Sequence, residues 1–275
     1  MSAITGLTST LVQGVNSVQA EISNVQNELA TGVKTMNPAQ KGIVTRLSSQ
    51  GAIYSADAAN ITQASSDINV GQTSLTNLST IISQMQQLAT QAASGGLSTT
   101  DLASLNTTFT ALASQISAAI QNATVNGTNF LYNSPTGTYG STTNGTITIQ
   151  IGLDTTGTAT IVGQGLDTTL AMLVTGLSIS SQTGANSAIT ALASGLTSVS
   201  TAQSNLNAYS TAMASDLASV TSLGANLTAT INSLQAVDQT AAQAELQQLN
   251  NQQSVDYYLV SQMNTEAAAI LTLFR

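Results

Sequence analysis

Cysteine, histidine and tryptophan are absent from this sequence of 275 residues, and lysine and arginine together number only four. Without cysteine or histidine, the chain has no disulfides, no thiol chemistry, no Cys/His metal site and no imidazole base. The twelve acidic residues are scattered, and no dinucleotide- or phosphate-binding glycine pattern occurs. We therefore expect no enzyme activity, no cofactor and no bound metal. The lack of cysteine also fits a protein that works outside the cell.

Charge is scarce as well. Charged residues make up 6% of the chain, against about 25% in an average globular protein, and the formal net charge is −8. A nucleic acid or an anionic membrane surface is therefore an unfavourable partner. No run approaches the ~20 apolar residues of a membrane span. The N-terminus has no basic residue before Lys34 and no compact apolar block, so we expect neither membrane insertion nor a cleaved signal peptide.

Three of the four basic residues cluster at Lys34, Lys41 and Arg46. One interpretation is a solvated connector between helices. The other is that these side chains pair with acidic residues on another segment or on another copy of the chain. Asp57 and Asp67 are nearby in the sequence, but the sequence alone does not identify the ionic partners.

Aromatic residues are also few, at 3%, so the core must consist of Leu, Ile, Val and Ala, which suits long helices packed along their lengths. The two prolines, Pro38 and Pro135, both fall where a pattern breaks. Apolar residues before Pro38 recur at spacings of three and four, which predicts one long helix with a heptad-like seam. The C-terminal segment has a similar seam, from Ala242 through Leu249 to Phe274, with a weaker middle. Neither seam has a partner within its own segment, so we expect the two terminal arms to pair.

The region between the arms also has helical periods. A helix pair is expected within 50–125, with the second helix starting at Thr100 or Asp101 after a glycine-containing loop. Alternating Thr and Ile predict a β-hairpin within 130–165, turning near residues 154–157. A long helix follows over 187–237. The expected fold is mainly α: a long antiparallel helical bundle or coiled coil with a small β-hairpin insertion.

Two helices alone bury a seam only partly, and Val12, Leu271 and Leu273 lie off the main stripe of the arms. We therefore expect the arms to be buried against other copies of the chain. The expected self-assembly seam consists of Ile4, Leu7, Leu11, Val15, Val18, Ile22, Val25, Leu29, Leu259, Met263, Ile270, Leu271, Leu273 and Phe274.

Five stretches, in the same order along the chain, resemble bacterial flagellin. They are NELATGVKTMN, NITQASSDINVGQTSLTNL, QQLATQAASG, ITIQIGLDTTGTATI and the terminal ILTLFR. The resemblance implies a structural subunit that self-assembles into the extracellular flagellar filament for swimming. In that arrangement the terminal arms, 1–38 and 238–275, form the inner filament core and 39–237 forms an outer core domain. The interval after the hairpin is short, so this resembles a minimal flagellin without large variable domains.

The resemblance also implies partners and leaves an alternative. A homopolymer is expected, together with a flagellar export chaperone, a filament cap and hook-junction proteins, and export would proceed without cleavage. A hook-filament junction protein shares the same kind of helical core, although the Arg-terminated tail and the hairpin favour flagellin. A secreted adhesin or enzyme built on a helical bundle has little support from the composition.

Two regions depart from the family pattern, and a third offers candidate modification sites. Pro38 to Lys41 replaces an acidic stretch, which affects the ionic contacts usual at this corner. Gln84 and Gln86 stand where many flagellins have two arginines read by a vertebrate innate immune receptor. The polar loop after the helix pair offers candidate glycan acceptors at Ser134, Thr136, Ser141, Thr142 and Thr143.

Overall fold

The computed structural model describes residues 2–125, 127–132, 147–153 and 157–273. The chain forms two compact units. The arm unit consists of Met1–Ser49 and Asn226–Arg275, and the bundle unit consists of Gln50–Ala225. Helices α2 (Pro38–Ala93) and α5 (Gln182–Gln235) contribute residues to both. Of the helices described, none is both long and apolar enough to cross a membrane.

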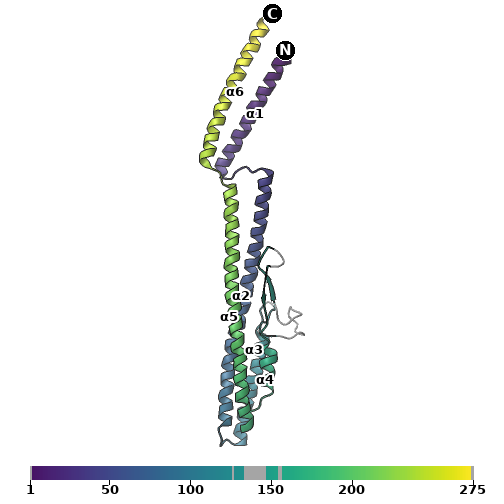
Figure 1. Cartoon of the computed structure of the whole chain (residues 1–275), viewed down its shortest axis with the longest axis vertical. Coiled ribbons are helices and arrows are strands. Elements are labelled where there is room, and N and C mark those ends of the chain that lie inside the picture. Colours follow the sequence, from purple (N-terminus) through teal and green to yellow (C-terminus); the bar gives the residue numbers. More distant parts are fainter. Residues whose placement is uncertain (1, 126, 133–146, 154–156, 274–275) are drawn as a thin grey trace. The chain divides into compact units, whose positions relative to one another are not determined.

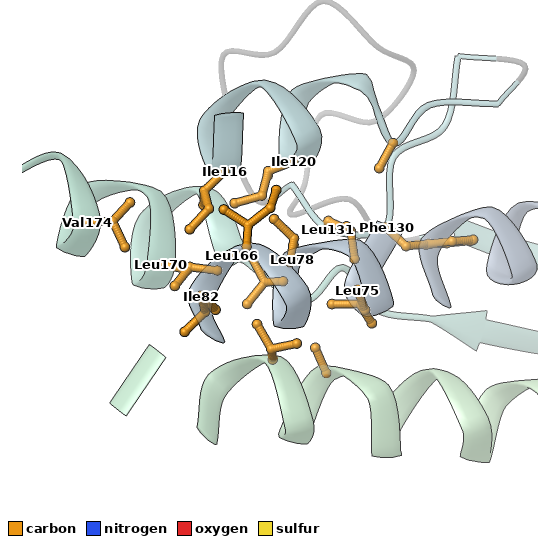
Figure 2. Close-up of a cluster of buried hydrophobic side chains, with 14 of the residues drawn as sticks. Leu75, Leu78, Ile82, Ile116, Ile120, Phe130, Leu131, Leu166, Leu170 and Val174 are labelled. Atoms are coloured by element: carbon orange, nitrogen blue, oxygen red, sulfur yellow. The ribbon is translucent and has the colours of Figure 1, made fainter. Parts of the chain in front are cut away.

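Helices α2, α3 (Thr99–Asn122) and α5 form the bundle unit, as the three- and four-residue spacings predict. The apolar stripe of α2 is completely buried at Ile61, Ile68, Leu75 and Ile82. Figure 2 shows part of this core, in which side chains of α2 and α3 meet others from the segment after the hairpin. The labelled side chains are Leu75, Leu78, Ile82, Ile116, Ile120, Phe130, Leu131, Leu166, Leu170 and Val174.

The start of α3 differs from the prediction. The helix cap is Ser98, rather than Thr100 or Asp101. The Asp101 backbone N–H donates to Ser98 Oγ at 3.2 Å, and the Ser98 N–H donates to Asp101 Oδ2 at 3.1 Å. This reciprocal pair is a capping box, in which Asp101 occupies the third helical position instead of the cap.

Helix α2 starts at Pro38, well before the helix pair expected from residue 50. The Gln40 N–H donates to Asn37 Oδ1 at 2.8 Å, and the Asn37 N–H donates to Gln40 Oε1 at 3.1 Å. Proline suits the first helical position because its fixed φ is already helical and no hydrogen bond is lost there. The signal for this start was present in the sequence as Asn-Pro followed by Gln at the third position.

The predicted hairpin is confirmed. Strand β1 (Ile147–Gln150) pairs antiparallel with β2 (Thr158–Ile161), with Ile147 opposite Ile161. Ile149 and Ile161 are buried, so the strands turn one face toward the bundle core. The expected turn falls mostly on 154–156, outside the described residues.

A short helical segment after the hairpin was not predicted. It consists of a π-helical turn, η1 (Asp167–Ala171), and α4 (Met172–Thr175), and both pack against α3. Leu170 and Val174 are fully buried there. The apolar run is too short to establish a helical period, so tertiary packing rather than local sequence stabilises it.

In the arm unit, α1 (Ser2–Thr31) packs along α6 (Gln239–Leu273), which confirms that the terminal helices pair (Figure 1). Helix α1 is followed directly by Gly32, whose φ of 70° favours glycine. The Lys34 N–H then donates to the Gln235 carbonyl at 2.8 Å, which joins the bases of the two arms. Asp238 caps α6 by accepting hydrogen bonds from the N–H groups of Thr240 and Ala241.

Candidate functional site

The seam between the arms is the first component of the site. Val15, Val18, Ile22 and Val25 of α1 are only 4–9% exposed. Three of them, all but Val15, pack with Ala242 and Leu249 of α6. Leu29 and Leu246 are partly buried at the edge of this cluster. Part of the predicted self-assembly seam is therefore already used within one chain.

The rest of the described seam is more open. Leu11 and Met263 are half-buried, and Leu259 is 44% exposed. Together with Thr10 and Gly14 they line a shallow apolar pocket of ≈ 310 Å³ between the two arms. A side chain at Gly14 would project into open space, so glycine leaves room at this point. The pocket can receive an apolar side chain from outside the arm pair.

Further apolar groups lie outside the seam. Val12 is 49% exposed, in agreement with its expected position off the main stripe, and Val255 and Tyr258 of α6 are 57% and 63% exposed. On α6, Tyr257 is half-exposed and its hydroxyl donates to Gln19 Oε1 of α1 at 3.3 Å. An exposed apolar surface on a monomer is typical of an interaction site.

Some predicted seam residues cannot be placed by side chain. Phe274 lies outside the described residues, and five others belong to helices whose side chains are not described at those positions. These five are Ile4, Leu7, Ile270, Leu271 and Leu273.

The basic cluster is exposed. Lys34 lies in the connector after α1, and Lys41 and Arg46 lie in the first turns of α2. None of the three forms an ion pair with any residue that the structure describes. The nearby Asp57 and Asp67 are buried rather than available at the surface. These cations therefore remain free to meet a partner.

Both buried carboxyls have raised pKa values. Burial raises the pKa of Asp57, whose Oδ2 has no hydrogen-bond partner. Burial also raises the pKa of Asp67, while a hydrogen bond from Gln63 Nε2 at 2.8 Å acts in the opposite direction. In contrast, hydrogen bonds from the Ser98 hydroxyl and backbone lower the pKa of Asp101. Perturbed carboxyls can indicate catalysis, but these three lie apart, on different turns and helices.

The remaining predicted positions fall in two regions. Gln84 is exposed and Gln86 is half-exposed on α2. The glycan candidates, Ser134, Thr136, Ser141, Thr142 and Thr143, lie outside the described residues. Within the described part of the chain, no group of three acidic, histidine or cysteine side chains could hold a metal ion.

Comparison with known proteins identifies flagellin both in a family model and in a solved structure. The family model for the bacterial flagellin N-terminal helical region matches residues 5–136. The crystal structure of Bacillus cereus flagellin is similar to this chain, with 25% sequence identity and a TM-score of 0.52. The similarity covers 59% of this chain and 88% of that flagellin. A comparison with curated protein sequences gave no match.

These matches agree with the features already described, namely a long helical bundle, a small hairpin and paired terminal helices with exposed apolar surface. Neither match favours the alternative of a hook-junction protein. Flagellins are structural proteins of the extracellular flagellar filament. Residues 5–136 therefore match the flagellin family model and the fold is similar to that of Bacillus cereus flagellin, findings that together support a flagellin-like structural subunit of the bacterial flagellar filament.

Proposed function

We propose that the arm unit is the polymerising part of this subunit and forms the inner core of the filament, while the bundle unit forms the outer layer. The observation that supports this proposal is the incomplete burial of apolar side chains on the arms. Two helices cover one stripe of each other, and Leu259, Val12 and Val255 remain 44–57% exposed. In the filament, other copies of the chain cover these side chains.

The free energy available from this burial is substantial. Fully burying a Val or Leu side chain is worth about 1.5–3 kcal/mol. Isolated helices gain little stability from propensity alone and depend on packing of an apolar face. Contacts with neighbouring copies therefore stabilise both the polymer and the arms themselves.

The family relationship supports several finer proposals. The subunit is exported through the flagellar secretion channel without cleavage, and it has no enzymatic activity and needs no cofactor. An export chaperone, a filament cap and hook-junction proteins act as its partners. In this proposal the two terminal arms, 1–38 and 238–275, act as one assembly element, and the outer core domain is the bundle unit, Gln50–Ala225, within the range 39–237 expected from the sequence.

Electron microscopy tests the polymerising role directly. Purified protein is dissociated by heating, cooled and examined for filaments. Long filaments of a single protein support the proposal. A protein that remains monomeric, or that only binds the ends of other filaments, contradicts it.

The surface around Gln84 and Gln86 supports a separate proposal: the protein is a poor ligand for the vertebrate receptor that reads arginines at these positions. Neutral amide hydrogen bonds contribute roughly 0.5–1.5 kcal/mol each, against about 1.5–3 for bonds to charged groups. The variant Gln84→Arg, Gln86→Arg should therefore signal more than about tenfold more strongly in a receptor-reporter assay with depolymerised protein. Strong signalling by the unmodified chain would contradict this.

A further inference from the structure

The bundle unit has no positively charged side chain. Its range, Gln50–Ala225, contains aspartate but no glutamate, lysine, arginine or histidine. Acid therefore removes the negative charge of this unit without leaving it positively charged. The aspartates of the unit are Asp57, Asp67, Asp101, Asp154, Asp167 and Asp216.

Acid unfolds many proteins through two effects of charge. Basic side chains repel one another once the carboxylates no longer offset their charge. In addition, carboxylates that form ion pairs in the folded state lose those pairs on protonation. The bundle unit has no cation of its own, so neither effect arises within it. Acid removes repulsion between its aspartates and creates none.

Two of the aspartates lie on the buried side of α2. Asp57 is 3% exposed and Asp67 is 7% exposed. Asp57 comes four residues before Ile61, and Asp67 comes four residues before Gly71, so both share the helix face of the apolar stripe. Asp57 Oδ2 has no hydrogen-bond partner. A buried carboxylate of this kind is costly in its charged form, and protonation removes that cost.

Helix α5 covers this part of α2. Gln72 Nε2 donates to Asn207 Oδ1 at 2.7 Å, and a Cβ added at Gly224 would lie 3.8 Å from Tyr54 Cβ. The two helices therefore run antiparallel, and both buried aspartates lie between these two points of approach. Their surroundings are set by the facing turns of α5.

The titratable groups around the two buried aspartates are few. Helix α2 contributes Tyr54, and α5 contributes Tyr209 and Asp216, all half-buried. Tyr132, from the segment before the hairpin, packs against the same core. Asp154 of the hairpin turn lies outside the described residues. None of these groups is a cation that could stabilise a buried carboxylate.

Protonation of the buried aspartates stabilises the fold. Burial raises the pKa of Asp57 and of Asp67. The resulting stabilisation is fully present below the ordinary pKa of 3.8 and is lost as the pH rises through the raised pKa. Asp101 acts in the opposite direction, because hydrogen bonds from Ser98 lower its pKa. That carboxylate is exposed at a helix end, where solvent screening weakens its contribution.

The surface of the bundle unit is polar without depending on pH. Exposed Thr73, Thr107 and Thr197, on three different helices, each donate a hydroxyl hydrogen bond to a helix carbonyl at 2.9–3.1 Å. Their hydroxyl oxygens can still accept hydrogen bonds from water. This hydration does not require a charge, so it persists in acid.

We propose that the bundle unit is an acid-stable domain, which keeps its fold and gains stability as the pH falls to about 3, and that this suits the subunit to an acidic medium. The inference concerns the single subunit. It does not depend on the polymerising role of the arms, so the two proposals can fail separately.

Urea unfolding of the full chain at pH 7, 5 and 3, followed by circular dichroism, tests the proposal. We expect the urea midpoint to rise from pH 7 to pH 3. The near-ultraviolet signal of the tyrosines should persist at pH 3, which distinguishes the native fold from a molten globule. In the variant Asp57→Asn, Asp67→Asn, the midpoint should change much less with pH.

A matched pair of variants tests the role of the missing cations. Six exposed positions without a printed side-chain partner are changed to lysine in one variant and to glutamate in the other. Lysine stays charged at pH 3, so the midpoint of this variant should fall from pH 7 to pH 3. Glutamate is largely neutral at pH 3, so its variant should behave like the original chain. The positions are Gln87, Ser104, Gln115, Ala193, Ser200 and Ala208.

Three outcomes overturn the proposal. The first is a lower urea midpoint at pH 3 than at pH 7 in the original chain, or loss of its near-ultraviolet signal. The second is an unchanged pH dependence in the Asp57→Asn, Asp67→Asn variant. The third is a lysine variant that still gains stability in acid.

The test remains decisive if a sample behaves poorly. If the original chain precipitates at pH 3, the infrared amide I band of the precipitate measures its helical content, and loss of helix overturns the proposal. If the lysine variant is unfolded at pH 7, the original chain and the double aspartate variant still decide the outcome.

Discussion

The bundle unit and the arm unit are built from the same kind of long, weakly charged helix, yet they bury their apolar stripes to different degrees. In the bundle unit, α2 has α5, α3, the hairpin and α4 around it, and Ile61, Leu75 and Ile82 are completely buried. In the arm unit, α1 packs along α6, and the most buried of their described side chains, such as Val18, are still 4% exposed or more.

The difference lies in how many elements pack around each helix rather than in composition. In the bundle unit, several elements close the core around α2, so this unit can be stable as a single copy. In the arm unit, the two paired helices keep apolar surface in contact with water. We propose that in a filament other copies complete the unit that is incomplete alone.

Removing residues 270–275 should have the largest effect, because it acts on the incomplete unit. These residues are mostly apolar, and we expect them to contact neighbouring copies. We expect no filaments by electron microscopy, with the thermal unfolding of the bundle unit unchanged. Filaments of normal length from the shortened chain would show that this tail is dispensable.

Phe109→Ala should be the most damaging single substitution in the bundle unit. Phe109 is fully buried, and truncating a buried Phe costs about 3–5 kcal/mol of unfolding free energy. Urea unfolding of the monomer provides the measurement. The matched control, Val18→Ala in α1, should leave this transition in place and impair polymerisation instead. Equal loss of monomer stability in both variants would argue against the contrast between the units.

Glycine substitutions sharpen the comparison further. A Cβ added at Gly195 would lie 2.8 Å from Leu170 Cδ1, which is itself fully buried, whereas one added at Gly14 meets nothing within 4 Å. Gly195→Ala should therefore destabilise the bundle by roughly 1–3 kcal/mol. Gly14→Ala should raise the helical content of α1, since alanine is a better helix former than glycine. A fully tolerated Gly195→Ala would mean that the bundle core is looser than its burial indicates.

Asp57→Asn should give the smallest effect on stability, and the size of this effect depends on pH. Because burial raises the pKa of Asp57 above its ordinary 3.8, the folded chain binds more protons than the unfolded chain as the pH rises from 3.8 through the raised pKa. The charged carboxyl therefore lowers stability as pH rises, and this loss disappears at acidic pH. Asp57→Asn should raise the unfolding free energy of the bundle by about 1 kcal/mol at pH 7, with no gain below pH 3.8.

Asp101→Asn provides a control of opposite sign. Hydrogen bonds from Ser98 lower the pKa of Asp101, so its charged form stabilises the cap of α3. This substitution should lower stability at pH 7, and the loss should vanish as the pH falls through the lowered pKa. Chemical denaturation of both variants between pH 3 and pH 8 distinguishes the two signs.

Much of the local structure could be predicted because it depends on short-range periodicity. The three- and four-residue spacings are sufficient to identify the terminal helices, and alternation of Thr with Ile identifies the hairpin. The start of α2 was also encoded locally, in the pair of hydrogen bonds between Asn37 and Gln40. The short helix α4 was not predictable in this way, because Leu170 and Val174 are held by α3 rather than by their neighbours in the chain.

The amino-acid sequence by itself therefore determined the helices, their apolar stripes, the scarcity of charge and the resemblance to flagellin. Tertiary structure decided which part of the arm seam is closed within one chain, at Val18 to Val25, and which part stays open around Leu259. The physical reason is register: Gln19 and Gln253 are separated by 234 positions, and no local pattern specifies how segments so far apart align.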